Sequence, residues 1–331
     1  MSQLGTLEVT SSGPYSILVD SGRRGFHHLG LTRGGPIDLS AFTLANRLCQ
    51  NDIDATVIEV TLGGLQAKVH APCVIALTGA CNNILINGQA KPLWCTHQLE
   101  AGDNIELTMA SSGLRSYLAI AGGFQLAKMF NSTSTVCREH VGGLSGDKLK
   151  VGDHISFLPS HFYATSSTKS ATTIKRRPQQ LALNAQQRIE QRYQQTKINL
   201  RLIPGYQYQD FDRVQRALFF NSEFEVSKDF DRMGYRLLGQ RITTDKVLTE
   251  SQALCLGAVQ IPSNGEPIVM LHDHQTIGGY PKIGTVIEPD LALLGQSRAG
   301  VKVQFTAIDV AQAHGIRLLQ RDKLCRLQLS P

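Results

Sequence analysis

The densest group of reactive side chains lies around a glycine in the second half of the chain. Asp231, Arg232 and Arg236 fall within six residues and flank Gly234. Guanidinium groups hold carboxylates or phosphates through paired, planar hydrogen bonds, and glycine lets the backbone approach a ligand closely. The segment is therefore a candidate site for an anionic substrate, with the aspartate and both arginines as candidate catalytic residues. A β-turn held by an Asp–Arg pair explains the same residues equally well.

A second polar segment follows the apolar run at residues 268–271. It supplies two side chains that donate and accept hydrogen bonds, a glycine pair, a ring and a charge: Gln275, Thr276, Gly278, Gly279, Tyr280 and Lys282. Polar groups at a strand end before a Gly-Gly loop suit a small polar ligand. We expect the first two to take part in catalysis and the other four to bind substrate. The alternative is a tight hairpin whose tyrosine packs into the core.

A third arginine lies in a glycine-rich loop, residues 22–38, that leads into a helical pattern at Leu39–Cys49. Asp38 or Ser40 is placed to cap this helix, and backbone N–H groups at a helix N-terminus attract anions. Arg23 is therefore a candidate substrate-binding residue. The loop lacks the GxxxxGK pattern of a P-loop, as does the rest of the chain. We expect any ATP to be used through another fold or by a partner protein.

Three further patterns give weaker indications. His272 and His274 share one face of a strand and suit two metal ligands, but no third ligand emerges, so we predict no metal. Ser132 and Ser134 lack the GxSxG context of an activated nucleophile, which favours a structural loop. The seven cysteines form no CxxC pair, which indicates reduced thiols rather than disulfides or zinc.

These groups lie on a mainly β chain. Short runs rich in Val, Ile, Leu and Thr, separated by glycine or asparagine turns, predict strands at 16–19, 55–60, 73–77, 83–86, 105–109, 115–120, 199–203, 258–261, 268–271, 285–287 and 301–307. Many short strands with one early helix indicate closed or sandwiched β-domains. The chain ends in an amphipathic, helical stretch at Val310–Leu327, which Gly315 is expected to interrupt.

Composition changes between residues 159 and 197. Ala164–Thr173 is nearly all Ser, Thr and Ala, and a glutamine-rich stretch follows. Such composition cannot bury a core, so we predict a polar linker, with Ala164–Thr173 mobile and one polar helix at Ala182–Gln194. The predicted domains are 1–158 and 198–331.

The two predicted domains carry matching segments in the same order. Residues 23–26 align with 232–235, 121–124 with 277–280, and 150–157 with 298–305. The spacing differs, since the first copy has a longer middle section. Three ordered matches favour an internal duplication.

Charge and hydropathy exclude several classes of function. The formal net charge of +6 gathers at 175–177 and 317–326, without the interleaved aromatics of a nucleic-acid surface. No apolar run reaches the roughly 18 residues that span a bilayer. The first ten residues lack a basic signal region, so we expect a cytoplasmic protein.

Eight ordered segments together carry a family resemblance. They are GRRGFHHLGLTRGGPID, LANRL, EVTLGG, ALTGA, RSYLAIAGG, DRMGYRLLG, GAVQIP and DHQTIGGYPKIGTVI. In them the chain resembles the allophanate hydrolase subunit 2 family of biotin-dependent carboxyltransferase-like proteins, most closely its 5-oxoprolinase C-type members. Phe230 departs from the serine usual in that family.

The resemblance implies two tandem cyclophilin-like β-barrel domains. It also implies that the chain is one component of an amidohydrolase, a 5-oxoprolinase that hydrolyses 5-oxoproline to glutamate at the expense of ATP, and that it is inactive alone. The implied partners are the B-like and A-like components of 5-oxoprolinase, and the implied cofactor is ATP, used by the assembled complex. Two alternatives share the same motifs: a carboxyltransferase component of the urea carboxylase or allophanate hydrolase type, and a non-catalytic antagonist of a kinase inhibitor.

Overall fold

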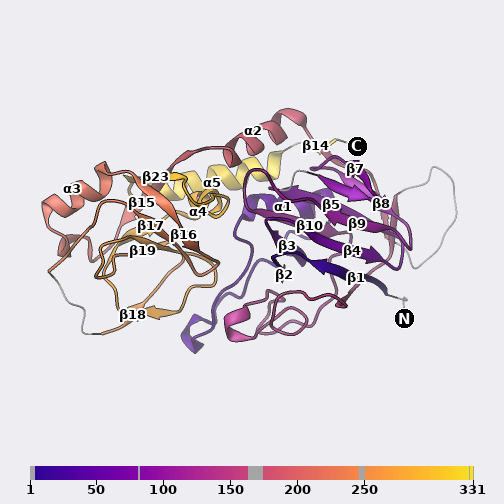
Figure 1. The fold of residues 1–331 in the computed structure, drawn as a ribbon, viewed down its shortest axis with the longest axis horizontal. Coiled ribbons are helices and arrows are strands. Elements are labelled where there is room, and N and C mark those ends of the chain that lie inside the picture. Colours follow the sequence, from indigo (N-terminus) through magenta and orange to yellow (C-terminus); the bar gives the residue numbers. More distant parts are fainter. Residues whose placement is uncertain (1–3, 81–82, 163–173, 246–249, 328, 331) are drawn as a thin grey trace. The chain divides into compact units, whose positions relative to one another are not determined.

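Strands dominate the chain and gather in two compact units, as the ribbon in Figure 1 shows. The computed structural model describes residues 4–80, 83–162, 174–245, 250–327 and 329–330. The first unit contains the described parts of 1–23, 34–193 and 326–331, and the second contains those of 24–33 and 194–325. The predicted boundaries at 158 and 198 stay a prediction. The segment predicted to be mobile, Ala164–Thr173, lies outside the described residues.

The first unit is built on two antiparallel sheets. One has the order β11-β1-β4-β9-β6-β7 and consists of β1 (Gly5–Ser12), β4 (Leu65–Val69), β6 (Ile84–Ile86), β7 (Gln89–Lys91), β9 (Asn104–Leu107) and β11 (His154–Phe157). The other has the order β2-β3-β10-β5-β8 and consists of β2 (Tyr15–Val19), β3 (Val57–Thr61), β5 (Cys73–Gly79), β8 (Thr96–Leu99) and β10 (Arg115–Ile120).

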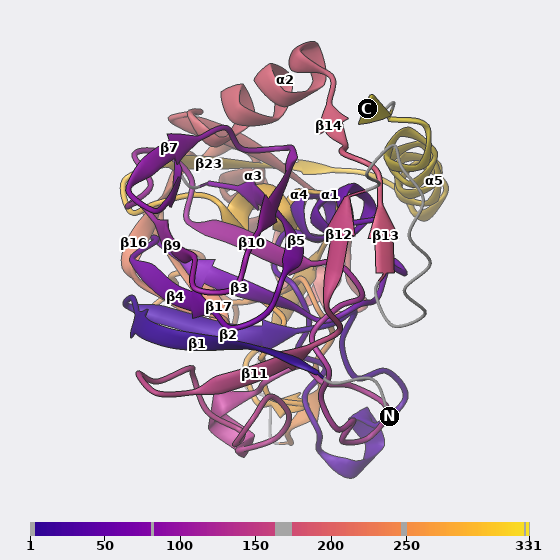
Figure 2. The ribbon, with the colours of Figure 1, turned by 90° about the vertical axis from the view of Figure 1, so that its right-hand side faces the viewer.

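Two small pairs and two helices complete this unit. They are the parallel pair β12 (Ser160–Phe162) and β13 (Ile174–Arg176), side by side in Figure 2, the pair β14 (Gln180–Leu181) and β24 (Leu329–Ser330), and helices α1 (Leu39–Leu48) and α2 (Leu183–Tyr193). Helix α1 packs on β5 and β10, where every residue is buried. Asp38 caps it as predicted, accepting from the backbone N–H groups of Ser40 and Ala41 at 3.1 Å.

A buried aspartate fixes one loop of the first unit. Asp20 accepts hydrogen bonds from the Ser132 and Ser134 hydroxyls at 2.6 and 2.7 Å and from the N–H of Thr133 at 2.7 Å. Burial by itself raises the pKa of Asp20, but these bonds and one from the N–H of Gly22 together lower it below its ordinary value. The two serines are therefore structural loop residues, as expected, because both hydroxyls serve this carboxylate.

The second unit closes into a barrel. Its strand order is β15-β22-β19-β20-β17-β16-β23, formed by β15 (Lys197–Pro204), β16 (Phe224–Phe230), β17 (Gly234–Leu238), β19 (Ala258–Gln260), β20 (Ile268–Met270), β22 (Lys282–Val286) and β23 (Lys302–Ala307). The pair β18 (Gln252–Ala253) and β21 (Ile277–Gly278) lies outside the barrel, with helices α3 (Arg213–Asn221), α4 (Glu288–Gly295) and α5 (Val310–Arg326). The mainly β fold is confirmed.

The interior of the barrel is filled by every second side chain of its strands. In β17, Tyr235 and Leu237 are fully buried, whereas Gly234 and Arg236 are partly exposed. Because successive side chains point to opposite faces, the buried pair fills the interior and its neighbours face outward. Val269 in β20 and Val259 in β19 are also fully buried and continue this interior layer.

Three helices differ from what the sequence predicts, and α4 is one that its patterns do not predict at all. Helix α5 runs through Gly315 without interruption, because a glycine inside a helix weakens it without blocking its hydrogen bonds. The sequence patterns also do not predict α3, where Asp212 caps the helix by accepting from the N–H of Gln215 at 2.8 Å. Among the described residues, no helix is long and apolar enough to cross a membrane.

One pair of the matching segments also agrees in its backbone hydrogen bonds. Val9 in β1 exchanges two bonds of 2.9 Å with residues 152–153 before β11. Val226 in β16 exchanges two bonds of 2.9 Å with residues 300–301 before β23. In each copy the glycine of the partner pair has a left-handed φ, 87° for Gly152 and 91° for Gly300. The matching segments 150–157 and 298–305 therefore form equivalent turns, each bonded to the equivalent strand of its own unit, β1 or β16.

The middle segments of the repeat do not share a conformation. Gly122 and Gly123 have positive φ values of 84° and 72°, whereas Gly278 and Gly279 do not adopt positive φ. The similarity of 121–124 to 277–280 therefore does not extend to the backbone.

We predict that Asp20→Asn lowers the free energy of unfolding by about 2 kcal/mol at pH 7, since its side-chain and backbone donors lose a charged acceptor. The pKa of Asp20 is lower in the folded chain than its ordinary value of 3.8. Its stabilising contribution is therefore full above that value and is lost as the pH falls through the folded pKa. Urea unfolding at several pH values checks this, and a difference that stays constant down to about pH 2 contradicts it.

Candidate functional site

The candidate site is a cavity of about 430 Å³ in the second unit. Its lining residues come from the barrel strands and the segments that follow them: Lys228, Asp229, Phe230, Asp231, Met233, Gly234, Arg236, Gln260, Ile268, Met270, Gln275 and Tyr280. Four predicted site residues are among them: Asp231, Arg236, Gln275 and Tyr280. The two polar segments singled out in the sequence thus meet at one place.

The floor of the cavity is the outward face of three neighbouring strands. Gln260 in β19 pairs with Ile268 in β20, which pairs in turn with Arg236 in β17. Gly234 pairs with Met270 two positions further along. Directly paired residues share a face, and this face is opposite to the one that Tyr235 and the other core residues occupy.

One wall of the cavity is the turn between β16 and β17. Asp231 fixes this turn by accepting from the N–H groups of Met233 and Gly234 at 2.7 and 3.1 Å. Phe230 lies against Tyr235 with ring centroids 4.9 Å apart. The structure therefore places an aromatic ring and a positioned carboxylate side by side at the rim.

Arg232 forms a buried ion pair with Asp273. Its side chain is 5% exposed, and its Nε and Nη2 donate to both carboxylate oxygens of Asp273 at 2.9 Å each. It does not line the cavity. A catalytic role for Arg232 stays a prediction, while in this geometry its Nε and Nη2 hold a buried carboxylate. The alternative of an Asp–Arg pair is correct in kind, with Asp273 rather than Asp231 as the partner.

The opposite wall is the segment that follows β20. Gln275 and Tyr280 reach the cavity, and Tyr280 is 48% exposed, which excludes the alternative of a tyrosine packed into the core. Thr276, Gly278 and Gly279 are not among the lining residues. The carbonyl of Thr276 accepts from the N–H of Leu254 at 2.9 Å, so this residue holds the wall to a neighbouring loop.

Lys282 lies beside the cavity without lining it. Its side chain is buried, and its Nζ donates to the carbonyl of Ala253 at 2.9 Å. The ammonium also lies 5.3 Å from the centroid of the Tyr206 ring. A substrate-binding role for Lys282 stays a prediction, and these contacts hold its ammonium between β18 and the segment that follows β15.

Arg23 belongs to the first unit and is not part of this cavity. It is 2% exposed, and it donates from Nε to the carbonyl of Met129 at 3.2 Å and from Nη2 to that of Ser134 at 3.1 Å. A substrate-binding role for Arg23 stays a prediction, while in this geometry its guanidinium is buried against the backbone of the loop at 129–134.

The histidine pair does not belong to a metal cluster in the part of the chain that the structure describes, where no group of three or more His, Cys, Asp or Glu side chains converges. His272 and His274 are both buried. His274 lies 5.4 Å from His27, ring centroid to ring centroid, and its carbonyl accepts from the Thr32 hydroxyl at 3.3 Å. This histidine therefore anchors the segment at residues 24–33 on the second unit.

Gln260 is the polar residue of the cavity floor that motif reasoning missed. It is 1% exposed and comes from an otherwise apolar strand. The sequence signal for Gln260 was a glutamine inside the run Gly257–Pro262, because a buried side-chain amide needs a hydrogen-bond partner. Lys228 and Asp229 also escaped notice, since charged residues before a turn are common on any surface.

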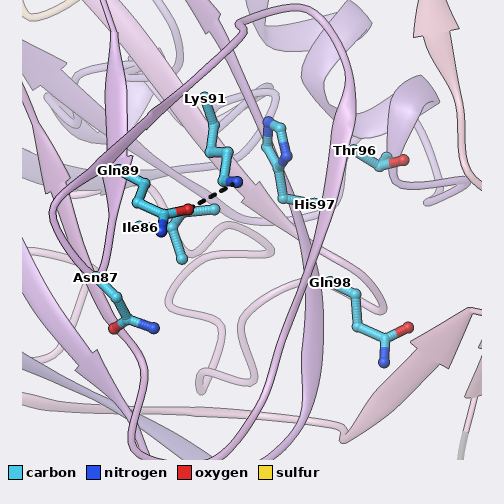
Figure 3. Close-up of a pocket in the computed structure, with 7 residues that line it drawn as sticks. All are labelled: Ile86, Asn87, Gln89, Lys91, Thr96, His97 and Gln98. Atoms are coloured by element: carbon cyan, nitrogen blue, oxygen red, sulfur yellow. Dashed lines mark hydrogen bonds between the residues drawn. The ribbon is translucent and has the colours of Figure 1, made fainter.

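A second cavity, of about 440 Å³, lies in the first unit (Figure 3). It is lined mostly by polar side chains of β7, β8 and the turn before β7, with Ile86 of β6, and Lys91 is turned toward Gln89 at 3.4 Å. His97 lies 3.4 Å from the thiol of Cys95, but burial raises the pKa of that thiol to about 11. The thiol is therefore protonated at neutral pH and not a nucleophile. We favour the cavity of the second unit because it combines opposed charges with a buried amide.

The charges of the favoured cavity suit a small ligand of mixed character. The lining includes Lys228 and Arg236 together with Asp229 and Asp231, so two cations balance two carboxylates. Such a lining fits one carboxylate or one amide but not a triphosphate, whose several negative charges need a surplus of cations or a nest of backbone donors. The residues present do not fit ATP.

We predict that Arg232→Lys lowers the free energy of unfolding by about 1–3 kcal/mol, because lysine cannot reproduce the paired bonds to the buried Asp273. Arg236→Lys is the matched control. Arg236 is partly exposed and lies 3.6 Å from Glu266, so this change should cost less than about 1 kcal/mol. Urea denaturation midpoints measure both, and equal losses would contradict the assignment.

Comparison with known proteins agrees with this architecture. The chain is 35% identical to the C-type component of 5-oxoprolinase from Escherichia coli over 93% of both chains, and 31% identical to that of Haemophilus influenzae over 90% of both. It is 28% identical to urea amidolyase of Saccharomyces cerevisiae over 94% of this chain and 17% of that protein. The fold matches the K. lactis urea amidolyase structure with a TM-score of 0.86, covering 98% of this chain and 20% of that one at 23% identity. The family model described as "Carboxyltransferase domain, subdomain A and B" matches residues 29–307, and the chain belongs to that family.

Proposed function

We propose that this chain is the C-type component of an ATP-dependent 5-oxoprolinase, which hydrolyses 5-oxoproline to glutamate together with B-like and A-like partner chains. The observation that carries the proposal is the match to the C-type 5-oxoprolinase relatives over 93% and 90% of both chains. The urea amidolyase match covers a similar share of this chain but only 17% of that protein. The bacterial relatives are therefore matched along nearly their whole length, which supports the C-type assignment.

The cavity of the second unit suits the proposed substrate. 5-Oxoproline carries a carboxylate and a cyclic amide on a small apolar ring. Arg236 is the lining residue whose fork matches a carboxylate, and Ile268 and Met270 provide an apolar floor for the ring. Gln275 offers an amide that can bond either the ring N–H or the carbonyl oxygen. In this proposal Arg236 and Gln275 orient the substrate.

Asp231 is the candidate proton acceptor of the proposed reaction. Two backbone N–H groups hold its carboxylate at the rim, so it stays positioned without a ligand. Opening a lactam with water requires a group that takes a proton from the attacking water. A carboxylate held beside the substrate's ring is suited to that step. Arg232 helps to fix the turn that carries this carboxylate through its bonds to Asp273.

The nucleotide is bound by a partner chain in this proposal. The balanced charges of the cavity do not suit a triphosphate, and the sequence contains no P-loop. ATP supplies activation of the amide in the assembled complex, while this chain holds and orients the amide. Carboxyl transfer onto a urea-like amide is the second candidate, favoured by the carboxyltransferase family and the urea amidolyase relatives.

We predict that the purified chain alone neither releases glutamate from 5-oxoproline nor hydrolyses ATP, whereas the chain with both partners does. Coupled assays of glutamate and phosphate release, with each component omitted in turn, measure this. Turnover by the single chain would contradict the division of labour. Urea-dependent carboxyl transfer in place of glutamate release would support the second candidate. Binding of a kinase inhibitor without any turnover would favour a regulatory antagonist.

We predict that Arg236→Met raises the KM of the assembled complex for 5-oxoproline by about tenfold to a hundredfold, the usual effect of losing a hydrogen bond between charged groups. Arg236→Lys keeps the charge and should give an intermediate KM. Steady-state kinetics at saturating ATP measure both variants. An unchanged KM in Arg236→Met would remove this arginine from the substrate site.

A further inference from the structure

Gln260 presents a buried hydrogen-bond donor to the candidate cavity. Its side chain is 1% exposed, yet its Nε2 has no hydrogen-bond partner among the residues that the structure describes. Buried polar groups in folded proteins are nearly always paired, because an unpaired donor has lost water without compensation. Gln260 lines the cavity, so a ligand there can supply the missing acceptor.

The surroundings of Gln260 keep its amide in this position. Gly278 lies directly over it, and a Cβ atom there would come within 2.7 Å of Nε2 and 2.9 Å of Leu254 Cδ1. Gly278 does not need a left-handed φ, so the close approach, and not the backbone conformation, explains why a glycine fits. Lys282, paired with Gln260 across β22 and β19, directs its ammonium to Ala253 instead.

The strand register relates Gln260 to Arg236. Ile268 pairs with both residues, so they lie two strand spacings apart on one face, about 10 Å between backbones. Long side chains that lean toward each other over Ile268 can hold the two ends of one small ligand. A neutral N–H donor suits a carbonyl oxygen at one end, and a guanidinium suits a carboxylate at the other.

We infer that Gln260 is the specificity-determining residue of this cavity, donating from Nε2 to the ring carbonyl oxygen of a small cyclic amide whose carboxylate lies at Arg236. The identity of this ligand as 5-oxoproline rests on the proposed function. The contact between Gln260 and a carbonyl oxygen does not, since any small amide that enters the cavity would make it.

Binding of matched ligands to the full chain tests the inference. The probes are 3-oxocyclopentanecarboxylate, which keeps the ring carbonyl and carboxylate of 5-oxoproline, and cyclopentanecarboxylate, which lacks the carbonyl. Calorimetry should show about tenfold tighter binding of the first probe, the effect of one hydrogen bond to an otherwise unpaired buried donor. In Gln260→Met this ratio should fall to about one, while Gln66→Met, at an exposed glutamine of β4, should leave it unchanged.

Two further measurements separate recognition from folding. Gln260→Met should melt at the same temperature as the wild type or higher, because replacing an unpaired donor with a thioether of similar shape removes a desolvation cost. A glutamine bonded within the fold would instead lower it. Gly278→Ala should also reduce the ratio, because its Cβ occupies the place of the Gln260 amide.

The inference is overturned if Gln260→Met keeps the wild-type ratio, or if no carbonyl-bearing probe binds the wild type. Glutamate release by the complex that is unaffected by Gln260→Met would likewise overturn it and leave the proposed function standing. A different outcome is that urea binds and its binding depends on Gln260, while 5-oxoproline does not bind. The carbonyl contact would then hold, and the oxoprolinase assignment would fail.

Discussion

The buried pair between Arg232 and Asp273 is the constraint on which the candidate site depends. It joins the turn before β17 to the segment after β20 with two side-chain bonds of 2.9 Å. Two backbone bonds accompany it, from Leu271 N–H to the Met233 carbonyl and from Asp273 N–H to the Arg232 carbonyl, at 2.8 and 2.9 Å. A buried charge is costly without its partner, so the pair favours the two segments lying together. These segments carry the opposite walls of the cavity. The ion pair between Arg232 and Asp273, neither of which lines the cavity, thus sets the distance between the two walls.

The closed barrel explains why the site lies on its outer face. A barrel of this size is filled by its own inward side chains, here Tyr235, Leu237, Val259 and Val269, so a ligand finds no room inside. Because side chains alternate between the two faces of a strand, each barrel strand also carries side chains that point outward and can contact a ligand. On β17, β20 and β19 that set includes Arg236, Ile268 and Gln260, which the register places in one row. The pair β18 and β21 brings Gly278 over the Gln260 end of this row and covers it.

Matching segments of the two units have equivalent backbone structure in one place but make different side-chain contacts in another. Val9 and Val226 make the same exchange of backbone bonds with a glycine turn, so the same local structure is built twice. The arginines that align in the repeat have diverged in their partners. Arg23 donates to backbone carbonyls in a loop that Asp20 organises, whereas Arg232 binds a carboxylate beneath the cavity. Neither arginine lines the cavity, which includes residues on both sides of Arg232 in the sequence.

The sequence by itself determined what depends on neighbours along the chain. The mainly β class, several strands, a cap at Asp38 or Ser40 and the family follow from side-chain alternation, capping chemistry and ordered motifs, and the two polar segments of the site were found by their composition. The predicted strands omit β1, β4, β16 and β17, of which the last two lie beside the cavity. The partner of each charged side chain was decided only by the tertiary structure. Arg232 and Arg236 have the same chemistry and lie four residues apart, yet one faces a buried aspartate 41 residues away and the other faces the cavity. Gln260 became informative only once β19 was placed beneath Gly278. Burial and long-range pairing are properties of the packed chain, and no local pattern specifies which of two similar residues a distant segment will contact.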